Sequence, residues 1–500
     1  MNDDTIAAIA TPEGRGGVGV IRVSGAGVSS IVNNVLKAPE LQPRTATLAT
    51  FLDADGKAID QGIAIHFPSP FSYTGEDVLE LQGHGGPVVL DLLLARLIEL
   101  GARSARPGEF TERAFHNDKL DLSQAEAVCD LIDSGTQAAA AAAIRSLQGD
   151  FGKAVHALVE ELTELRIYLE AALDFPEEEI DFLASTEMQQ RAAALRANSA
   201  RLMDNIKQGQ LLRDGFTVVL AGKPNAGKSS ILNRLTGEDT AIVTDVEGTT
   251  RDIVRSDIQI DGLPVRLIDT AGLRDSDDPV EREGIRRAAL SMLQTDRILW
   301  IADATDNCAT SLTADAQTQM IATSVSAALT KAFALLDGEY DALAARVVAV
   351  DFLINKIDLS GDAAGMLAPQ SDEPVSIDLV SGGSPGNAAE AGIALKVGSS
   401  GKISAATGAG FEQLREHLLC CAGFRHNDDS VFIARRRHLE ALHKARESIE
   451  LGFRQLEINA SPELAAEDFR SAQNSLGEIT GKFTSDDLLG RIFAGFCIGK

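Results

Sequence analysis

The sequence predicts a multidomain protein of the α/β + α class. We expect a small α+β domain first, then a helical domain, and a doubly wound α/β domain inserted into the helical one. The chain has 500 residues, several times the usual size of one domain. Short β-rich runs separated by Gly and Pro turns occupy its beginning. Helical spacing of apolar residues lies on both sides of a region in which strands alternate with helices.

The N-terminal domain is expected over residues 1–118, where runs such as Val18–Val23 and Gly62–Phe67 have the β-branched pattern of strands. Beyond this point turn residues become scarce. Apolar residues then recur at steps of three and four, as at Leu158, Leu162, Leu165, Leu169 and Leu173. This periodicity predicts long helices, which form the first part of the helical domain over residues 119–212.

The inserted domain is expected over residues 213–420, because the continuous apolar run Phe216–Ala221 opens an alternation of strands and helices. Helical periodicity returns afterwards, so residues 421–500, with the C-terminal CIGK tail, complete the helical domain. Two stretches in the inserted domain are interpreted as additions. Residues 306–345 are predicted to be helical, and residues 360–402 a long loop, functional or mobile, of which we favour mobile.

Composition narrows the class of protein. With 44% hydrophobic and 24% charged residues the chain is predicted to be soluble and globular. It has no apolar run of the roughly 20 residues that cross a bilayer, and no signal sequence, so we expect it in the cytoplasm. Five cysteines without a CxxC pair indicate reduced thiols rather than disulfides or a zinc knuckle. A net charge of -27 opposes broad adhesion to nucleic acid, so any RNA contact must be local.

The segment Gly222–Ser230 matches GxxxxGK[ST] directly after an apolar strand. Glycines let backbone N–H groups turn towards a polyphosphate, and the following helix N-terminus favours negative charge. Lys228 is expected to contact the β- and γ-phosphates, and the Ser229 hydroxyl to bind Mg²⁺.

A second strand ends in Asp269–Gly272, a carboxylate followed by a small turn. Asp269 is expected to hold the Mg²⁺ through water, and the Gly272 N–H to contact the γ-phosphate. Between the two motifs lies Gly248–Asp252, in which Thr250 is the natural second hydroxyl for Mg²⁺. Together these segments predict a nucleoside triphosphate site.

Base selectivity is predicted by Asn355–Asp358, which follows an apolar strand. Asp358 can accept from the ring N–H and the exocyclic amine of guanine, whereas adenine has no such pair of donors on that edge. Backbone N–H groups of Ser404–Ala406 would support the base. The set GKSS, TT, DTAG, NKID and SA resembles a translation-factor-related GTPase.

The residue that positions the attacking water is not evident from these motifs. Leu273 stands where Ras-like enzymes have Gln, so hydrolysis is either feeble or uses another polar group. The charged segment Arg274–Ile285 offers carboxylates, but taken alone it favours a solvated switch loop. Asn225 could bind a monovalent cation beside the phosphates, or simply favour a turn.

Further motifs extend the resemblance over essentially the whole chain. They are Gly14–Gly19 with Arg22, Thr74–Glu80 with His84–Gly86, Arg106–Thr111, Asn117–Leu122 and Phe496–Lys500. With these motifs the sequence closely resembles the MnmE, or TrmE, family of tRNA uridine-modification GTPases. The resemblance implies a small α+β folate-binding N-terminal domain, a discontinuous helical domain and an inserted Ras-like P-loop GTPase domain.

The resemblance also implies the ligands of the first domain. It would bind 5-formyl- or 5,10-methylene-tetrahydrofolate and pair with a second copy in a homodimer. Arg22, Glu80, Lys119 and Lys500 match the folate-binding positions. Their charges suit the glutamate tail and the pterin, although each taken singly is also typical of a surface charge.

For hydrolysis, the resemblance implies K⁺-dependent dimerisation of the GTPase domains. The catalytic residues would be Lys228, Glu281, which orients water, and Cys497, a thiol suited to covalent catalysis or simply packed in the tail. Mg²⁺ would be bound by Ser229 and Thr250. The K⁺ ligands would be Asn225, Thr244, Val246 and Thr249. The full GTP-binding set would be Asn225, Ala226, Gly227, Lys228, Ser229, Ser230, Thr244, Asp245, Val246, Glu247, Gly248, Thr249, Thr250, Asp269, Thr270, Ala271, Gly272, Asn355, Lys356, Asp358, Ser404, Ala405 and Ala406.

The implied activity is modification of carbon 5 of the wobble uridine of certain tRNAs with an aminomethyl or carboxymethylaminomethyl group. It would require an FAD-containing partner of the MnmG type, forming a heterotetramer. The flavin is assigned to the partner because no GxGxxG loop lies on a βαβ unit here. The alternatives are an Era-like or Der-like ribosome-assembly GTPase, and a nucleotide switch that binds no folate.

Overall fold

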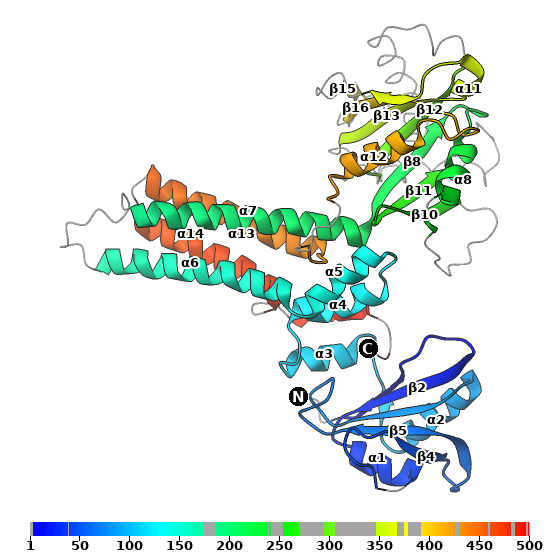
Figure 1. The fold of residues 1–500 in the computed structure, drawn as a ribbon. Helices are drawn as coiled ribbons and strands as arrows, with labels where there is room; N and C mark the ends of the chain where they lie inside the picture. The colour runs from blue at the N-terminus through cyan, green and yellow to red at the C-terminus, as the bar shows by residue number, and fades with distance from the viewer. Residues whose placement is uncertain are drawn as a thin grey trace, which may run out of the picture. The chain divides into compact units, whose positions relative to one another are not determined.

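The structure is a computed structural model that describes residues 4–38, 40–174, 186–238, 240–241, 254–269, 295–305, 347–367, 375–378, 392–425, 431–458, 461–481, 486–496 and 499 (Figure 1). Contacts divide the chain into two units. The first comprises Met1–Asp133, Ala141–Ile206 and Ala434–Lys500, and the second comprises Ser134–Ala140 and Lys207–Ile433. The domain boundaries expected after residues 118, 212 and 420 stay predictions. Within the described ranges, no helix has both the length and the apolar character of a membrane span.

The first unit contains a seven-stranded sheet in the order β3-β4-β5-β6-β2-β1-β7. Its strands are β1 (Ile6–Ile9), β2 (Gly16–Ser24), β3 (Leu36–Lys37), β4 (Thr47–Leu52), β5 (Ala58–Phe67), β6 (Val78–Gly85) and β7 (Arg103–Ser104). Helices α1 (Val28–Val35) and α2 (Pro87–Glu99) share a core with the sheet, in which Ile21, Ile31 and Leu93 are fully buried. The strands predicted over Val18–Val23 and Gly62–Phe67 are confirmed.

The helical part of this unit is built from two segments of chain. The first provides α3 (Glu109–His116), α4 (Leu122–Ile132), α5 (Gln137–Leu147), α6 (Asp150–Asp174) and α7 (Thr186–Asp214), and the second provides α13 (Arg436–Glu457), α14 (Pro462–Thr480) and α15 (Asp486–Ala494). Helix α14 packs against α13 and α6 (Figure 1). The predicted apolar stripe of α6 is buried at Leu158, Leu162, Leu165 and Leu169. A discontinuous helical domain is therefore confirmed.

Helix α4 begins at a capping box, which explains why the chain turns sharply into it. The Asp121 side chain accepts from the Gln124 N–H, and the Gln124 side chain accepts from the Asp121 N–H. Each bond satisfies a backbone donor that a helix start leaves without a partner. This cap lies in the Asn117–Leu122 motif, between the sheet and the helices.

The second unit contains a nine-stranded sheet whose main path is β14-β16-β13-β12-β8-β11-β10-β9. Its elements are β8 (Phe216–Gly222), α8 (Lys228–Glu238), β9 (Thr240–Ala241), β10 (Val254–Ile260), β11 (Leu263–Asp269), β12 (Arg297–Asp303), β13 (Val347–Asn355), α11 (Ile357–Ser360), β14 (Gly365–Leu367), β15 (Val375–Asp378), β16 (Gly392–Lys402) and α12 (Phe411–Ala422). Strands β11, β8, β12, β13 and β16 are parallel neighbours. Their carboxyl ends therefore meet at one edge, where ligands bind in such sheets.

One prediction about this unit is wrong. The segment 360–402 was expected to be a long loop, but it contains β14, β15 and β16, and β16 pairs in parallel with β13. The abundant Gly, Ser and Pro residues conceal this strand, because its pairing depends on the neighbouring strand rather than on local composition. The helix predicted over residues 306–345 lies outside the described residues.

Candidate functional site

The phosphate loop connects β8 to α8 and depends on glycine at two positions. Gly222 has a φ of +140°, and a Cβ there would lie 2.2 Å from the Ile301 carbonyl oxygen. Gly227 has a φ of +92°, and a Cβ there would lie 2.2 Å from Nδ2 of Asn355. At both positions the loop backbone lies too close to its neighbours for a side chain to fit. Glycine permits this close approach and leaves the N-terminus of α8 open to an anion.

Lys228, the first residue of α8, is buried against this loop. Its Nζ donates to the carbonyl oxygens of Gly222 and Lys223, each at 3.0 Å. These bonds hold the ammonium group over the loop, so a positive charge is in place where a polyphosphate would enter.

Ser229 and Asp269 form the candidate Mg²⁺ site. The parallel register places Asp269, at the end of β11, opposite Leu220 of β8, and the Ser229 Oγ donates to Asp269 Oδ2 at 2.9 Å. The other oxygen of Asp269, Oδ1, is buried and has no hydrogen-bond partner among the described residues. A hydroxyl and a carboxylate are hard oxygen donors that fit Mg²⁺, and a bound hydrated cation would satisfy the unpartnered oxygen.

Asn355 joins the phosphate loop to the guanine loop. Its Nδ2 donates to the Ala226 carbonyl oxygen at 3.0 Å, and its Oδ1 accepts from the Ala405 N–H at 3.0 Å. Asp358 accepts a hydrogen bond from the Ser404 hydroxyl. The phosphate loop and the two segments predicted to read the base therefore converge on the end of β13.

Two residues at this site were not predicted from the sequence. Asp303 ends β12, directly opposite Asn355, and its Oδ2 lies 2.6 Å from Nζ of Lys356. Burial raises the pKa of Asp303, but the Lys356 ammonium outweighs it and holds this pKa below its usual value. Arg234 of α8 donates from Nη1 to the carbonyl oxygens of Ala405 and Ala406 at 3.0 and 3.1 Å. Asp303 could have been found from the sequence, because it ends a strand that is parallel to the strand ending at Asn355. Arg234 belongs to no motif and could not.

In the first unit, the structure brings Arg22 and Glu80 together. These residues lie opposite each other on β2 and β6, and Nε and Nη2 of Arg22 both donate to Glu80 Oε1, at 3.0 and 2.9 Å. The guanidinium carbon of Arg22 lies 5.2 Å from the ring centroid of Tyr73 and 5.8 Å from that of Phe110. Burial raises the pKa of Tyr73, so its hydroxyl stays protonated. Arg22 and Glu80 thus form an ion pair beside two aromatic rings.

The other two folate candidates are placed differently. Lys119 is exposed and its Nζ donates to the Pro70 carbonyl oxygen at 3.0 Å. No contact between Lys119 and the Arg22–Glu80 pair is present in the described ranges. Gly499 lies against β1, because a Cβ on Gly499 would be 2.5 Å from the Ile9 carbonyl oxygen; the neighbouring residue Ala8 stands opposite Arg22. Lys500 itself is not described.

Several predicted residues lie outside the described residues, so their roles stay predictions. They are Thr244, Asp245, Val246, Glu247, Gly248, Thr249, Thr250, Thr270, Ala271, Gly272, Glu281, Cys497 and Lys500. Of the expected K⁺ ligands, only Asn225 is described; it is exposed and has a φ of +64°, the left-handed conformation of a turn. Among the described residues, Cys129, Cys420 and Cys421 form no disulfide.

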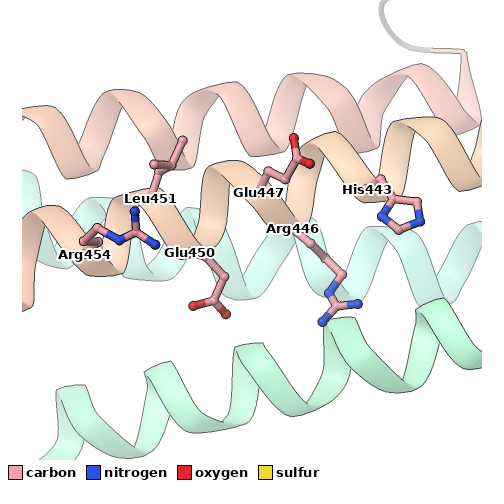
Figure 2. Close-up of a pocket in the computed structure, with 6 residues that line it drawn as sticks. All are labelled: His443, Arg446, Glu447, Glu450, Leu451 and Arg454. Atoms are coloured by element: carbon pink, nitrogen blue, oxygen red, sulfur yellow. The ribbon is translucent and has the colours of Figure 1, made fainter. Parts of the chain in front are cut away.

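A further hollow of about 430 Å³ lies along α13 and includes no predicted site residue. Figure 2 shows its lining, which is His443, Arg446, Glu447, Glu450, Leu451 and Arg454. Arg196 of α7 forms ion pairs at 3.2 Å with Glu450 and with Glu457. Since the lining charges are of both signs and Glu450 is paired with Arg196, the groove is a solvated helix surface.

Two protein-family models match this chain. The family model described as the GTP-binding protein TrmE N-terminus matches residues 5–119, and the model described as the MnmE helical domain matches residues 122–497.

Two full-length relatives are both named tRNA modification GTPase MnmE. The protein of Ectopseudomonas mendocina (strain ymp) is 51% identical over 497 residues, and that of Pseudomonas aeruginosa (strain PAO1) is 51% identical over 499 residues. In both cases 99% of this chain and 99% of the relative are covered.

Among solved structures, a GTP-binding protein of Sulfolobus solfataricus in complex with GDP matches 53% of this chain and 67% of its own, with 16% identity and a TM-score of 0.23. The G domain of the T. maritima FeoB iron transporter matches 41% of this chain and 98% of its own, with 20% identity and a TM-score of 0.20. These scores are too low to relate whole structures. Sequence identity over the full length is decisive instead, and the chain belongs to the MnmE, or TrmE, family of tRNA modification GTPases.

Proposed function

We propose that this chain hydrolyses GTP in the cytoplasm to drive a conformational cycle that serves modification of the wobble uridine of certain tRNAs. With an FAD-containing partner of the MnmG type, in a heterotetramer, it would add an aminomethyl or carboxymethylaminomethyl group to carbon 5 of that base. The observation that carries the nucleotide part is the pair of hydrogen bonds by which Asn355 joins Ala226 to Ala405. It supports simultaneous recognition of phosphate and base.

Each described residue has a defined task in this proposal. Asp358 accepts hydrogen bonds from the guanine ring N–H and amine, and Lys228 places its charge on the β- and γ-phosphates. Ser229 and Asp269, with Thr250, hold the magnesium ion, which when bound neutralises charge on the phosphate oxygens. Glu281 orients the attacking water, a task that Leu273 cannot perform.

Base selectivity tests the nucleotide part. Asp358→Asn replaces an acceptor pair by an amide, so the variant should lose GTP turnover by at least about a hundredfold and accept xanthosine triphosphate, whose added carbonyl pairs with the amide N–H. Turnover of GTP, ATP and xanthosine triphosphate measures this. Preference of the unaltered chain for ATP would contradict guanine selection.

The proposed potassium site is formed by Asn225 with Thr244, Val246 and Thr249, and it brings two GTPase domains together. A cation at this place neutralises phosphate charge that an arginine finger otherwise neutralises. GTP turnover in K⁺ should exceed that in Na⁺ by at least about tenfold at equal ionic strength. Asn225→Ala should remove this difference. Equal rates in the two salts would exclude the site.

The proposed folate site uses Arg22 and Glu80, with Lys119 and the terminal Lys500, at the interface of a homodimer. The Tyr73 and Phe110 rings beside Arg22, and Gly499 beside β1, support it. Titration of the full chain with 5-formyl-tetrahydrofolate should give saturable binding. Arg22→Ala should weaken it by more than about tenfold, because a guanidinium–carboxylate contact is lost. Arg436→Ala, an exposed charge paired with Glu440, is the matched control and should not.

The biological role is tested by nucleoside analysis of tRNA after deletion of the gene. The modified wobble uridine should disappear, return with the intact gene, and remain absent with Lys228→Ala. An unchanged nucleoside profile in the deletion strain would refute the role in tRNA modification, and would favour the ribosome-assembly alternative.

A further inference from the structure

Three side chains with different ligand atoms converge inside the second unit. His417 and Cys421 lie one turn apart on α12, so both face the same side of the helix. Asp351 of β13 is completely buried and faces them. One imidazole nitrogen, the thiol sulfur and one carboxylate oxygen of this Asp351–His417–Cys421 cluster all lie within 4.8 Å of one another. None of the three belongs to the nucleotide site described above.

The backbone around Asp351 is shaped to admit its carboxylate. The pairing of β13 with β16 shifts register between Val350 and Phe352, which places an irregularity at Asp351 itself. Such bulges re-aim a side chain. Opposite it stands Gly398, where a Cβ would lie 2.2 Å from Asp351 Oδ1. The register shift and the absence of a side chain at Gly398 therefore make room for the Asp351 carboxylate in an otherwise apolar strand.

One ring nitrogen is the meeting point of the cluster. His417 Nε2 lies 2.8 Å from Asp351 Oδ2 and 3.3 Å from Cys421 Sγ. A single N–H donates well to one acceptor at a time. A proton on His417 Nε2 therefore forms a hydrogen bond with the Asp351 carboxylate and leaves the Cys421 sulfur without a good one. A cation placed between the three atoms would serve all of them.

The surroundings suit an outer shell around such a cation. Asp351 Oδ1 accepts from the Ser399 N–H at 2.8 Å and from Arg297 Nη1 at 2.8 Å. Hydrogen bonds to the oxygen that does not bind the metal orient a ligating carboxylate and stabilise its buried negative charge. Arg297 Nη1 also donates to Asp351 Oδ2 at 2.9 Å, so the guanidinium contacts both oxygens of the carboxylate. His417 Nε2 contacts the same Oδ2.

We propose that Asp351, His417 and Cys421 form a binding site for a borderline transition-metal ion, Zn²⁺ above all. Zn²⁺ in proteins is bound by carboxylate, imidazole and thiolate groups, usually four ligands in a tetrahedron. Three protein ligands therefore leave a fourth position for water. Carboxylate and thiolate together carry two negative charges. With Arg297, which is paired with Asp351 at 2.8 Å, the occupied site would carry one net positive charge. Binding of the ion would displace the thiol proton of Cys421 to solvent.

The site would couple two elements of the GTPase unit. Asp351 lies on the strand that ends at Asn355, and α12 follows the guanine loop directly. An ion shared by β13 and α12 therefore fastens the helix to the strand that holds the base-reading motif. This role is independent of folate, potassium and tRNA, and it needs no catalytic step.

Cobalt substitution of the full chain provides the test. The chain is stripped with a chelator, saturated with GDP and excess Mg²⁺ to fill the nucleotide site, and titrated with Co²⁺. One equivalent should produce the near-ultraviolet band of thiolate-to-cobalt charge transfer, and Zn²⁺ should abolish it. An oxygen-ligand site at the nucleotide cannot produce that band. Absence of the band in the unaltered chain would overturn the proposal.

Neighbouring cysteines supply a matched pair of variants. Cys421→Ser should lose the band, whereas Cys420→Ser, at the adjacent and exposed thiol, should retain it. His417→Gln should weaken Zn²⁺ binding by more than about a hundredfold, since loss of even an outer-shell partner costs 10- to 100-fold. Circular dichroism checks that each variant folds. A band that survives in Cys421→Ser would place the ion at another cysteine and refute the site.

A measurement on the unaltered chain avoids dependence on the variants. Zn²⁺ should slow alkylation of Cys421 by iodoacetamide by at least about tenfold, because a metal-bound thiolate is shielded, and should leave Cys420 unaffected. Peptide mass spectrometry distinguishes the two adjacent thiols by fragmentation. Equal protection of both, or of neither, would mean that the cluster is only an ion-paired network.

Discussion

Arg234 donates a hydrogen bond from Nη1 to the carbonyl oxygen of Ala405 at 3.0 Å, across a sequence separation of 171 residues. Arg234 lies on the helix that begins at the phosphate loop, and Ala405 lies in the loop predicted to support guanine. The same guanidinium lies 5.6 Å from the ring centroid of Phe411, at the start of α12. The phosphate-side helix thus holds the base-side loop in place.

Arg234→Ala should weaken GDP binding about tenfold. Two hydrogen bonds from a charged donor disappear, and one such bond is worth about 1.5 kcal/mol or more. Titration with a fluorescent GDP analogue measures the affinity. Arg234→Lys, which keeps the charge but reaches only one carbonyl, should restore part of it.

Arg266→Ala is the control, because Arg266 forms an exposed ion pair with Asp257 at 3.0 Å. Exposed pairs are worth about 0–1 kcal/mol, so GDP affinity should not change. If both variants lose affinity equally, the effect belongs to general destabilisation and not to the guanine loop.

Gly227→Ala should reduce GDP binding by at least about a hundredfold. The new methyl would lie 2.2 Å from Asn355 Nδ2 and would sit at a positive φ, so it would break the link between the two loops. Calorimetric titration with GDP measures this. Gly237→Ala, in the helix that follows this loop and with nothing within 4 Å of the new Cβ, should keep the affinity and add up to about 1 kcal/mol of stability. Equal behaviour of the two variants would contradict the role given to Gly227.

Glu126→Gln should destabilise the first unit by about 3 kcal/mol. Glu126 is fully buried and accepts from Arg437 Nε and Nη2 at 2.7 and 2.6 Å, while His438 Nε2 lies 2.8 Å from it. Removal of one partner from a buried ion pair leaves a charge without compensation. Urea unfolding followed by helix circular dichroism measures the loss. Glu440→Gln, in an exposed pair with Arg436, should change stability by less than about 1 kcal/mol.

The same carboxylate makes the first unit sensitive to acid. Burial raises the pKa of Glu126, but the charges and hydrogen bonds of His438 and Arg437 outweigh burial and hold it far below the ordinary 4.5. Its contribution to the free energy of unfolding is therefore complete above pH 4.5, and it is lost as the pH falls from there towards the depressed pKa. Glu126→Gln should flatten the fall in stability below about pH 4.5. An unchanged slope in that range would show that other carboxylates dominate it.

Local patterns predicted the parts of the fold that depend on neighbours in sequence. The apolar run Phe216–Ala221 became β8, and the leucines at steps of three and four became the buried stripe of α6. The strand β16 escaped prediction, since its residues are held by pairing with β13 rather than by their own propensities.

Among the site residues, Lys228, Ser229, Asp269, Asn355 and Asp358 could be predicted, because each belongs to a short motif whose chemistry is readable in order. Asp303 could have been found only from its place at the end of a strand parallel to β13, and Arg234 and the Asp351–His417–Cys421 cluster could not be predicted. Their partners come from other strands and helices, so no spacing along the chain marks them.

The sequence by itself determined the family of this protein and the guanine-nucleotide motifs, since those depend on residue types at fixed short spacings. Tertiary structure alone decided that Asn355 reaches Ala226 across 129 residues, that Arg234 holds Ala405, and that a buried carboxylate meets a histidine and a thiol on α12. The physical reason is the order of strands in the sheet, which sets which distant backbones become neighbours, and that order arises from packing of the whole core.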